Sequence, residues 1–149
     1  MRRILIVEDE EIIRQGLVCT IDWLSMDCVV VGDAPDGKAG LELLRRERPD
    51  ILLTDIRMPR MDGIEMAEHA RAEGILPHLV FLTSYAEFGY AKKAIELRAV
   101  DYLLKPVDEK ELAALMQRLA GEEQARGAEE SPMDRIDWRH YFEDDALNP

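Results

Sequence analysis

The sequence at residues 50–63 reads Asp-Ile-Leu-Leu-Thr-Asp-Ile-Arg-Met-Pro-Arg-Met-Asp-Gly. Its apolar run, Ile51–Leu53, has no polar alternation, which is typical of a strand buried on both faces. The strand leads to Asp55, and the pair Asp62-Gly63 then marks a loop just ahead of a helical segment. A buried strand followed by a loop and a helix is one unit of a parallel α/β sheet.

The same unit recurs along most of the chain. Short runs rich in Val, Ile and Leu alternate with longer segments that have apolar residues at helical spacing. The five runs are Ile4–Val7, Val29–Val31, Ile51–Leu53, Leu79–Leu82 and Tyr102–Leu104. Because alternating strands and helices need crossover connections, the sequence predicts an α/β fold with a parallel five-stranded sheet, spanning roughly 120 residues.

Composition limits the class of protein. The chain has 149 residues and a formal net charge of −12. This length suits one domain, and the negative charge argues against a large nucleic-acid interface, because phosphate backbones attract Lys and Arg. No run approaches the roughly 18 apolar residues of a membrane span, and acidic Glu8 follows too early for a signal peptide. Cys19 and Cys28 form no Cys-x-x-Cys motif. We therefore expect a soluble, cytoplasmic protein without a membrane partner.

The end of the chain differs from the rest. From Ala120 to Pro149, nine acidic residues stand against three arginines, a net charge of −6 and half of the chain's total. The segment has no sustained apolar period, so we assign residues 1–120 to the folded domain and 121–149 to an acidic, flexible tail. Within the tail, Trp138, Tyr141 and Phe142 have the spacing of one helix face. A poorly ordered terminus, a docking segment and the start of a linker are all open interpretations.

Ionisable or hydroxyl side chains follow four of the five predicted strands. The first run is followed by Glu8-Asp9, the third by Thr54-Asp55, the fourth by Thr83-Ser84 and the fifth by Lys105-Pro106. The second strand ends near Asp33, to which the pattern assigns no role. Because the carboxyl ends of parallel strands share one edge of a sheet, where ligands bind, we expect three carboxylates, a hydroxyl and an ammonium to meet there.

Three neighbouring carboxylates repel one another unless a cation lies between them. Mg²⁺ prefers a few carboxylate oxygens together with waters and a phosphate, and Lys and hydroxyl groups bind phosphoryl oxygens. Asp55 is the best candidate for a nucleophile, because it stands on the central strand between the other groups. Each acid alone is compatible with a solvated helix cap. Their joint occurrence on successive strand ends favours a Mg²⁺-dependent phosphoacceptor.

Four motifs carry a resemblance to a known family. They are Ile-Leu-Ile-Val-Glu-Asp-Glu at 4–10, the stretch at 50–63, Leu-Thr-Ser-Tyr at 82–85 and Asp-Tyr-Leu-Leu-Lys-Pro-Val at 101–107. From Arg3 to Leu119 the chain resembles the receiver domain of bacterial two-component response regulators. The resemblance implies a flavodoxin-like (βα)5 fold with strand order 2-1-3-4-5, a sensor histidine kinase as partner and Mg²⁺ as cofactor. It implies no enzyme in the usual sense, because a receiver catalyses only its own phosphotransfer and autodephosphorylation.

The resemblance also implies roles for the acidic residues. Asp55 is the phosphoacceptor, and it binds Mg²⁺ directly together with Asp9. Glu8 binds the ion through water, and the backbone carbonyl of Arg57 supplies a further oxygen.

For the switch, the resemblance implies a second group of residues. Lys105 pairs with the phosphoryl group through its ammonium, and the Lys105-Pro106 bond is expected to be cis. Thr83 is the switch hydroxyl, and Tyr102 is the aromatic side chain that moves with it. The surface expected to respond is formed by the fourth helix, the fifth strand and the fifth helix, and a receiver homodimer through it is one expectation. This surface includes Lys92, Lys93, Glu96, Arg98 and Asp101.

The sequence is compatible with three interpretations of the output of the domain. Residues 85–107 and Ile21-Asp22-Trp23 are similar to receivers that precede AraC-type helix-turn-helix DNA-binding halves, but no such half follows here, so DNA binding by this chain is not carried over. The chain is interpreted as a stand-alone receiver, as the N-terminal fragment of a transcriptional regulator, or as a phosphorylation-independent scaffold. An aspartyl-phosphate phosphatase would need an acid where Arg57 stands, and a nucleotide site would need a glycine-rich loop.

Overall fold

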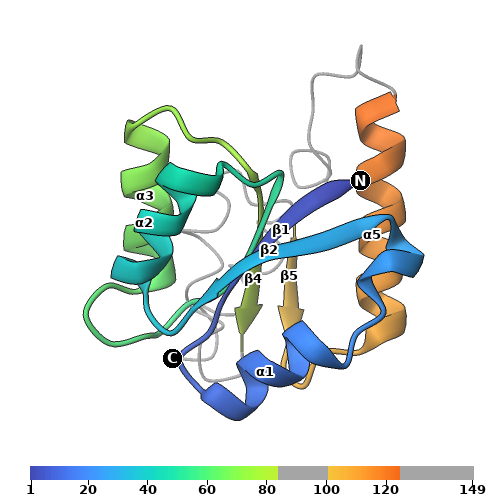
Figure 1. Cartoon of the computed structure of the whole chain (residues 1–149), viewed down its shortest axis with the longest axis horizontal. Helices are drawn as coiled ribbons and strands as arrows, with labels where there is room; N and C mark the ends of the chain where they lie inside the picture. The colour runs from blue at the N-terminus through green and yellow to red at the C-terminus, as the bar shows by residue number, and fades with distance from the viewer. Residues whose placement is uncertain (84–100, 125–149) are drawn as a thin grey trace, which may run out of the picture.

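The computed structural model is a three-layer α/β sandwich, described for residues 1–83 and 101–124 and without the side chains of 101, 102 and 122–124 (Figure 1). Five strands form one sheet in the order β2-β1-β3-β4-β5, and all neighbouring strands are parallel. The strands are β1 (Arg2–Val7), β2 (Cys28–Ala34), β3 (Ile51–Asp55), β4 (His78–Thr83) and β5 (Asp101–Leu104). The predicted fold class and strand order are therefore confirmed.

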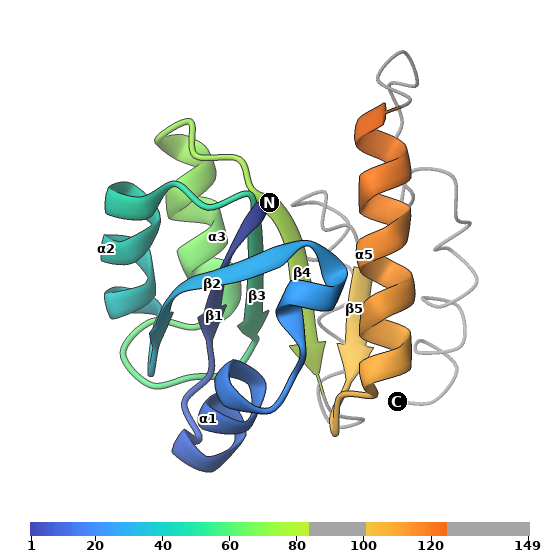
Figure 2. The ribbon, with the colours of Figure 1, turned by 45° about the vertical axis from the view of Figure 1, so that its right-hand side comes forward.

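The described helices cover both faces of the sheet. Figure 2 shows α2 (Gly37–Glu47) and α3 (Gly63–Ala72) on one side, and α1 (Glu11–Cys19) and α5 (Glu109–Gln124) toward the other. A short 3-10 turn, η1 (Trp23–Met26), leads into β2. The fourth helix expected between β4 and β5 falls within residues 84–100, outside the described residues. At the other end, α5 continues beyond Ala120 to Gln124.

Strand β1 shows why the sheet is covered on both faces. Ile4 and Ile6 are fully buried among residues of α1 and α5, whereas Leu5 and Val7 are fully buried among residues of α2 and α3. Each such side chain stabilises the fold by about 1.5–3 kcal/mol relative to an exposed position. Because apolar side chains gain this stabilisation on both faces of the sheet, the run Ile4–Val7 is apolar throughout instead of alternating with polar residues.

Two of the helices begin at aspartates followed by glycine. Asp62 caps α3: its Oδ1 accepts from the Glu65 N–H at 2.7 Å, and the Glu65 side chain accepts in return from the Asp62 N–H at 3.3 Å. Asp36 caps α2 by accepting from the Ala39 N–H at 2.8 Å. These caps satisfy N–H groups that a helix leaves unpaired at its first turn. They also fix the two loops that leave β2 and β3 at one edge of the sheet.

Two features of the described residues bear on the expectations from composition. No helix in residues 1–83 and 101–124 combines the length and the apolar character that crossing a membrane requires. Cys19 is exposed and Cys28 is buried, and both are free thiols. The tail aromatics Trp138, Tyr141 and Phe142 lie outside the described residues.

Candidate functional site

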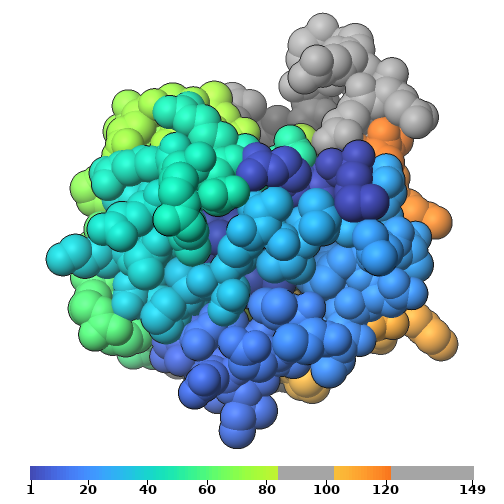
Figure 3. Space-filling model, in the orientation of Figure 1, coloured from blue at the N-terminus to red at the C-terminus, as the bar shows by residue number. Residues whose placement is uncertain are grey.

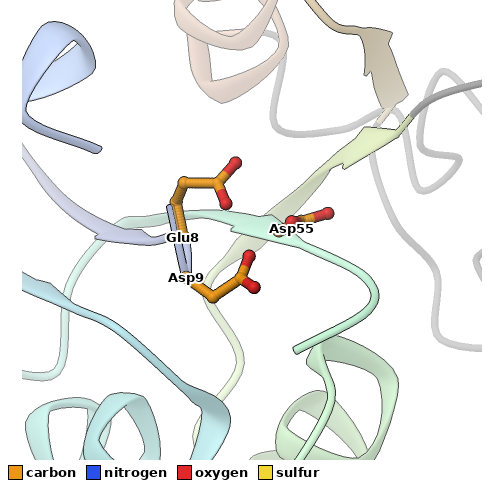
Figure 4. Close-up of side chains that lie close together, drawn as sticks. All are labelled: Glu8, Asp9 and Asp55. Carbon is orange, nitrogen blue, oxygen red and sulfur yellow. The ribbon is translucent and has the colours of Figure 1, made fainter. Parts of the chain in front are cut away.

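Three carboxylates converge at the carboxyl edge of the sheet. Glu8 and Asp9 follow β1 directly and Asp55 ends β3, and Figure 4 shows their side chains turned toward a shared space. One oxygen of each carboxylate lies within 4.8 Å of the others. Glu8 is fully buried and Asp55 is 2% exposed, whereas Asp9 is exposed. The acids expected to meet at this edge are thus brought together.

Lys105 joins the cluster from the end of β5. Its Nζ donates to Glu8 Oε1 at 3.1 Å and to Asp55 Oδ2 at 3.1 Å. Its own N–H donates to the carbonyl oxygen of Thr83 at 2.8 Å, and the Lys105-Pro106 bond is cis, as expected. Burial acts to lower the pKa of Lys105, but the hydrogen bond to Glu8 and the charge of Asp55 outweigh it and raise the pKa above its usual range. The group therefore stays an ammonium.

Burial and mutual repulsion make it unfavourable for all three carboxylates of the cluster to be ionised. Burial is the main reason that the pKa of Glu8 is raised from 4.5 to about 7, and the charge of Asp55 adds to it. The Glu10 N–H, which donates to Glu8 Oε2 at 3.1 Å, acts in the opposite direction. A small divalent cation would relieve this repulsion. The donors within this cluster are carboxylate oxygens, which suit Mg²⁺ better than the softer transition metals.

The backbone around Asp55 is closely constrained. The Ile56 N–H donates to Asp55 Oδ1 at 2.7 Å, and the Thr54 hydroxyl donates to the Asp55 carbonyl oxygen at 2.9 Å. Gly63, at the start of α3, lies so close that a Cβ there would be 2.1 Å from the same carbonyl oxygen. The sequence indicated Gly63 only as part of a loop signal, and its contact with Asp55 was missed.

The switch residues are only partly within the described region. Thr83 is 2% exposed at the end of β4, next to the strand that carries Asp55. The backbone of Tyr102 pairs with Phe81 in β5, but its side chain is not described. Lys92, Lys93, Glu96 and Arg98 lie outside the described residues, as does the side chain of Asp101.

A cleft of about 750 Å³ opens from this cluster. Asp9, Asp55 and Lys105 line one part of it, and the exposed Arg57 stands at its wall. The cleft continues along α1, past residues such as Ile13, toward the connection between β5 and α5. The cleft therefore connects the end of β3, where Asp55 lies, with solvent.

The loop after β3 has a further anchor that sequence reasoning missed. Arg60 Nε donates to Asp36 Oδ2 at 2.9 Å, and the Gly37 N–H donates to the Met61 carbonyl oxygen at 2.9 Å. The two helix starts thus hold each other in place. Asp36 and Arg60 are 24 residues apart, and a contact over that separation leaves no periodic pattern in the sequence. The Asp-Gly pairs therefore indicated the two loops but not the contact between them.

The comparisons with known proteins agree with this geometry. The model of the response regulator receiver domain matches residues 4–117, so the chain belongs to that family. An uncharacterized response regulatory protein of Staphylococcus epidermidis is 34% identical over 158 aligned positions, which cover 99% of this chain and 62% of that protein.

Solved structures give the same family. The receiver domain of AraT, a response regulator from Geobacillus stearothermophilus, is 41% identical with a TM-score of 0.74, over 82% of this chain and 98% of that one. A two component transcriptional regulator AraC from Clostridium phytofermentans is 36% identical with a TM-score of 0.73, over 86% of this chain and 100% of that one.

The likeness extends to more than one type of regulator. Response regulators of the LuxR family also match, so the chain is similar to both AraC-type and LuxR-type regulators. The chain spans less than two thirds of the length of the curated relatives that it matches.

Proposed function

We propose that the chain is the phosphorylation-dependent receiver of a two-component system, in which Asp55 accepts a phosphoryl group from a sensor histidine kinase. The observation that carries this proposal is the position of the Asp55 carboxylate. It is buried at the strand end, lies beside two other acids, and receives a hydrogen bond from Lys105 Nζ at 3.1 Å. The chain then catalyses only its own phosphorylation and dephosphorylation.

The covalent steps balance with the groups present. An Asp55 carboxylate oxygen attacks phosphorus, the P–N bond of the donor phosphohistidine breaks, and its electron pair returns to the imidazole nitrogen. The product is an acyl phosphate on Asp55. In the separate dephosphorylation step, a water oxygen attacks phosphorus, the bond between phosphorus and the Asp55 oxygen breaks with its electron pair returning to the carboxylate, and inorganic phosphate leaves with the protons of the water. The Lys105 ammonium binds a phosphoryl oxygen and offsets charge that builds up in the transfer.

Mg²⁺ fits the donor set of the site. Asp9 and Asp55 would hold it directly, Glu8 through water, and Arg57 through its carbonyl oxygen, as the family resemblance implies. When bound, the ion supplies positive charge that stabilises the transferring phosphoryl group. The buried Glu8, whose pKa burial raises to about 7, supports the fit, because nearby cationic charge favours its ionised form.

Signal output rests on the resemblance. In this proposal, the Thr83 hydroxyl donates to a phosphoryl oxygen and moves inward, and Tyr102 follows it. The fourth helix, β5 and α5 then present a changed surface, which is a local charge event acting on a two-state element. We expect this process in the cytoplasm.

Phosphorylation in solution tests the assignment. The purified chain is incubated with Mg²⁺ and acetyl phosphate, and its intact mass is measured beside Asp55→Asn. The control is Asp50→Asn, at the opposite end of β3, where Asp50 accepts a hydrogen bond from the Arg3 N–H. We expect one added phosphoryl group on the wild type and on Asp50→Asn, and none on Asp55→Asn. Equal labelling of Asp55→Asn would refute the site.

Transcription regulation is a second candidate for the output of the complete protein. It is supported by the likeness to a solved transcriptional regulator and by relatives that extend beyond the length of this chain. In this version the chain is the receiver of such a regulator and does not itself bind DNA.

A further inference from the structure

Asp33, the acid at the second strand end that the sequence left without a role, has a partner in the structure. Arg14 Nε donates to Asp33 Oδ2 at 3.0 Å, and Arg14 Nη1 donates to the carbonyl oxygen of Glu8 at 2.8 Å. The Arg14 side chain is only 12% exposed. Arg14 lies on α1 and Asp33 on β2, two elements that meet on the face toward the viewer in Figure 3. One guanidinium therefore joins α1, the end of β2 and the end of β1.

These contacts fix the peptide that presents two of the three acids. The Glu8 N–H donates to the Ala34 carbonyl oxygen at 3.0 Å, and the Glu8 carbonyl accepts from Arg14. The Glu10 N–H donates back to Glu8 Oε2 at 3.1 Å. The Glu8 carbonyl belongs to the peptide that leads into Asp9. Its orientation therefore constrains the backbone from which the exposed Asp9 side chain extends.

We propose that Arg14, held by Asp33, is a positioning residue that orients the Glu8-Asp9 peptide for binding of the divalent cation. This inference rests on the proposed function, since it concerns the same metal site. Groups that orient metal ligands without touching the metal typically change its affinity about 10–100-fold when they are removed. Asp33 has a second effect: it offsets the charge of the guanidinium, which would otherwise repel a cation nearby.

For Arg14→Gln, a positioning role and a simple charge effect predict opposite changes in Mg²⁺ affinity. Removal of a positive charge near the site alone would strengthen binding of Mg²⁺. Loss of the Glu8 carbonyl contact would weaken it, because the peptide that carries Asp9 is no longer held. The direction of the change therefore separates the two effects.

A matched control lies at the other end of the same strand. The Arg3 guanidinium donates to the carbonyl oxygen of Glu47 and, at 2.9 Å, to Glu47 Oε1. Like Arg14, Arg3 thus contacts both a backbone carbonyl and a carboxylate. It does so at the amino end of β1, away from the acidic cluster. Arg3→Gln removes the same charge and the same kind of contact.

The experiment is isothermal titration of the full chain with Mg²⁺ for the wild type, Arg14→Gln, Asp33→Asn and Arg3→Gln, with circular dichroism to confirm folding. We expect the Mg²⁺ Kd of Arg14→Gln to rise about tenfold, that of Asp33→Asn to rise by a smaller factor, and that of Arg3→Gln to stay near the wild-type value.

The outcomes distinguish this inference from the proposed function. A Kd for Arg14→Gln equal to or below that of the wild type overturns the positioning role, as does an equal rise in Arg3→Gln. If Arg14→Gln does not fold, Arg14→Lys decides, because it keeps the positive charge and loses the guanidinium that contacts both Asp33 and the Glu8 carbonyl: weaker Mg²⁺ binding supports the positioning role and unchanged binding overturns it. A wild-type chain that binds no Mg²⁺ overturns the metal site itself, and the positioning role with it.

Discussion

The position of Asp55 depends on its neighbours Thr54 and Gly63 as well as on strand β3. Its carbonyl oxygen is enclosed by the Thr54 hydroxyl and by Gly63, whose lack of a side chain lets α3 start directly beside β3. The Gly63 N–H donates to the Ile56 carbonyl oxygen at 2.7 Å, which fixes the same corner. A glycine is required here by close approach of two backbones.

The variant Gly63→Ala tests this corner. A Cβ placed 2.1 Å from the Asp55 carbonyl oxygen must displace backbone, so we expect a loss of about 1–3 kcal/mol in the free energy of unfolding and slower phosphorylation by acetyl phosphate. Urea denaturation and intact mass over time measure the two effects. The control is Gly121→Ala, exposed on α5 with nothing within 4 Å of its Cβ, which should gain about 0.5–1 kcal/mol. Wild-type values for Gly63→Ala would contradict the account.

At the level of elements, the starts of α2 and α3 are coupled. Asp36 is 5% exposed, caps α2 and pairs with Arg60, which has a positive φ of 68° in the loop after β3. The hydrogen bond from the Ala39 N–H lowers the pKa of Asp36, and the pairing with Arg60 adds to this against the effect of burial. The ionised carboxylate is therefore the form that the fold favours.

This coupling predicts a pH dependence. Because the pKa of Asp36 is lower in the folded state than in the unfolded chain, its stabilisation is present above its ordinary pKa of 3.8 and is lost as the pH falls through the folded value. We expect Asp36→Ala to lose about 1 kcal/mol at pH 7, and the difference from wild type to narrow below a pH of about 4. Urea denaturation of both proteins at pH 7 and at a pH below about 4 measures this difference in the free energy of unfolding. A difference that stays constant with pH would contradict the charge effect.

The elements themselves could be predicted because burial leaves a pattern in the sequence. Ile4–Val7 and Ile51–Leu53 lack polar residues, since helices cover both faces of their strands, and this follows from local sequence. The end of α5 was less predictable. Its apolar stripe ends at Leu119, but the helix continues to Gln124, because backbone hydrogen bonds need no apolar side chain.

Within the site, the sequence predicted the groups that follow strands and missed the groups that hold them. Glu8, Asp9, Asp55 and Lys105 share one edge because parallel strands end together. Arg14 and Gly63 act through contacts across the fold. Such contacts depend on strand register and loop paths, which no spacing in the sequence reports.

For the whole molecule, the proposed phosphorylation predicts a change in what the domain contacts. If the chain is the receiver of a transcriptional regulator, we expect beryllofluoride with Mg²⁺ to shift it from monomer to dimer through the fourth helix, β5 and α5. Light scattering after size exclusion measures the mass. A persistent monomer that gains affinity for another protein would instead favour a stand-alone receiver. Asp55→Asn is the control and should not respond.

The most direct measurement of the central claim locates the phosphoryl group. After incubation with Mg²⁺ and acetyl phosphate, the chain is reduced with borohydride, which converts an aspartyl phosphate to homoserine, and the peptides are sequenced by tandem mass spectrometry. The account predicts homoserine at position 55 and intact aspartate at positions 50 and 62. Homoserine at another aspartate, with position 55 unchanged, would contradict it.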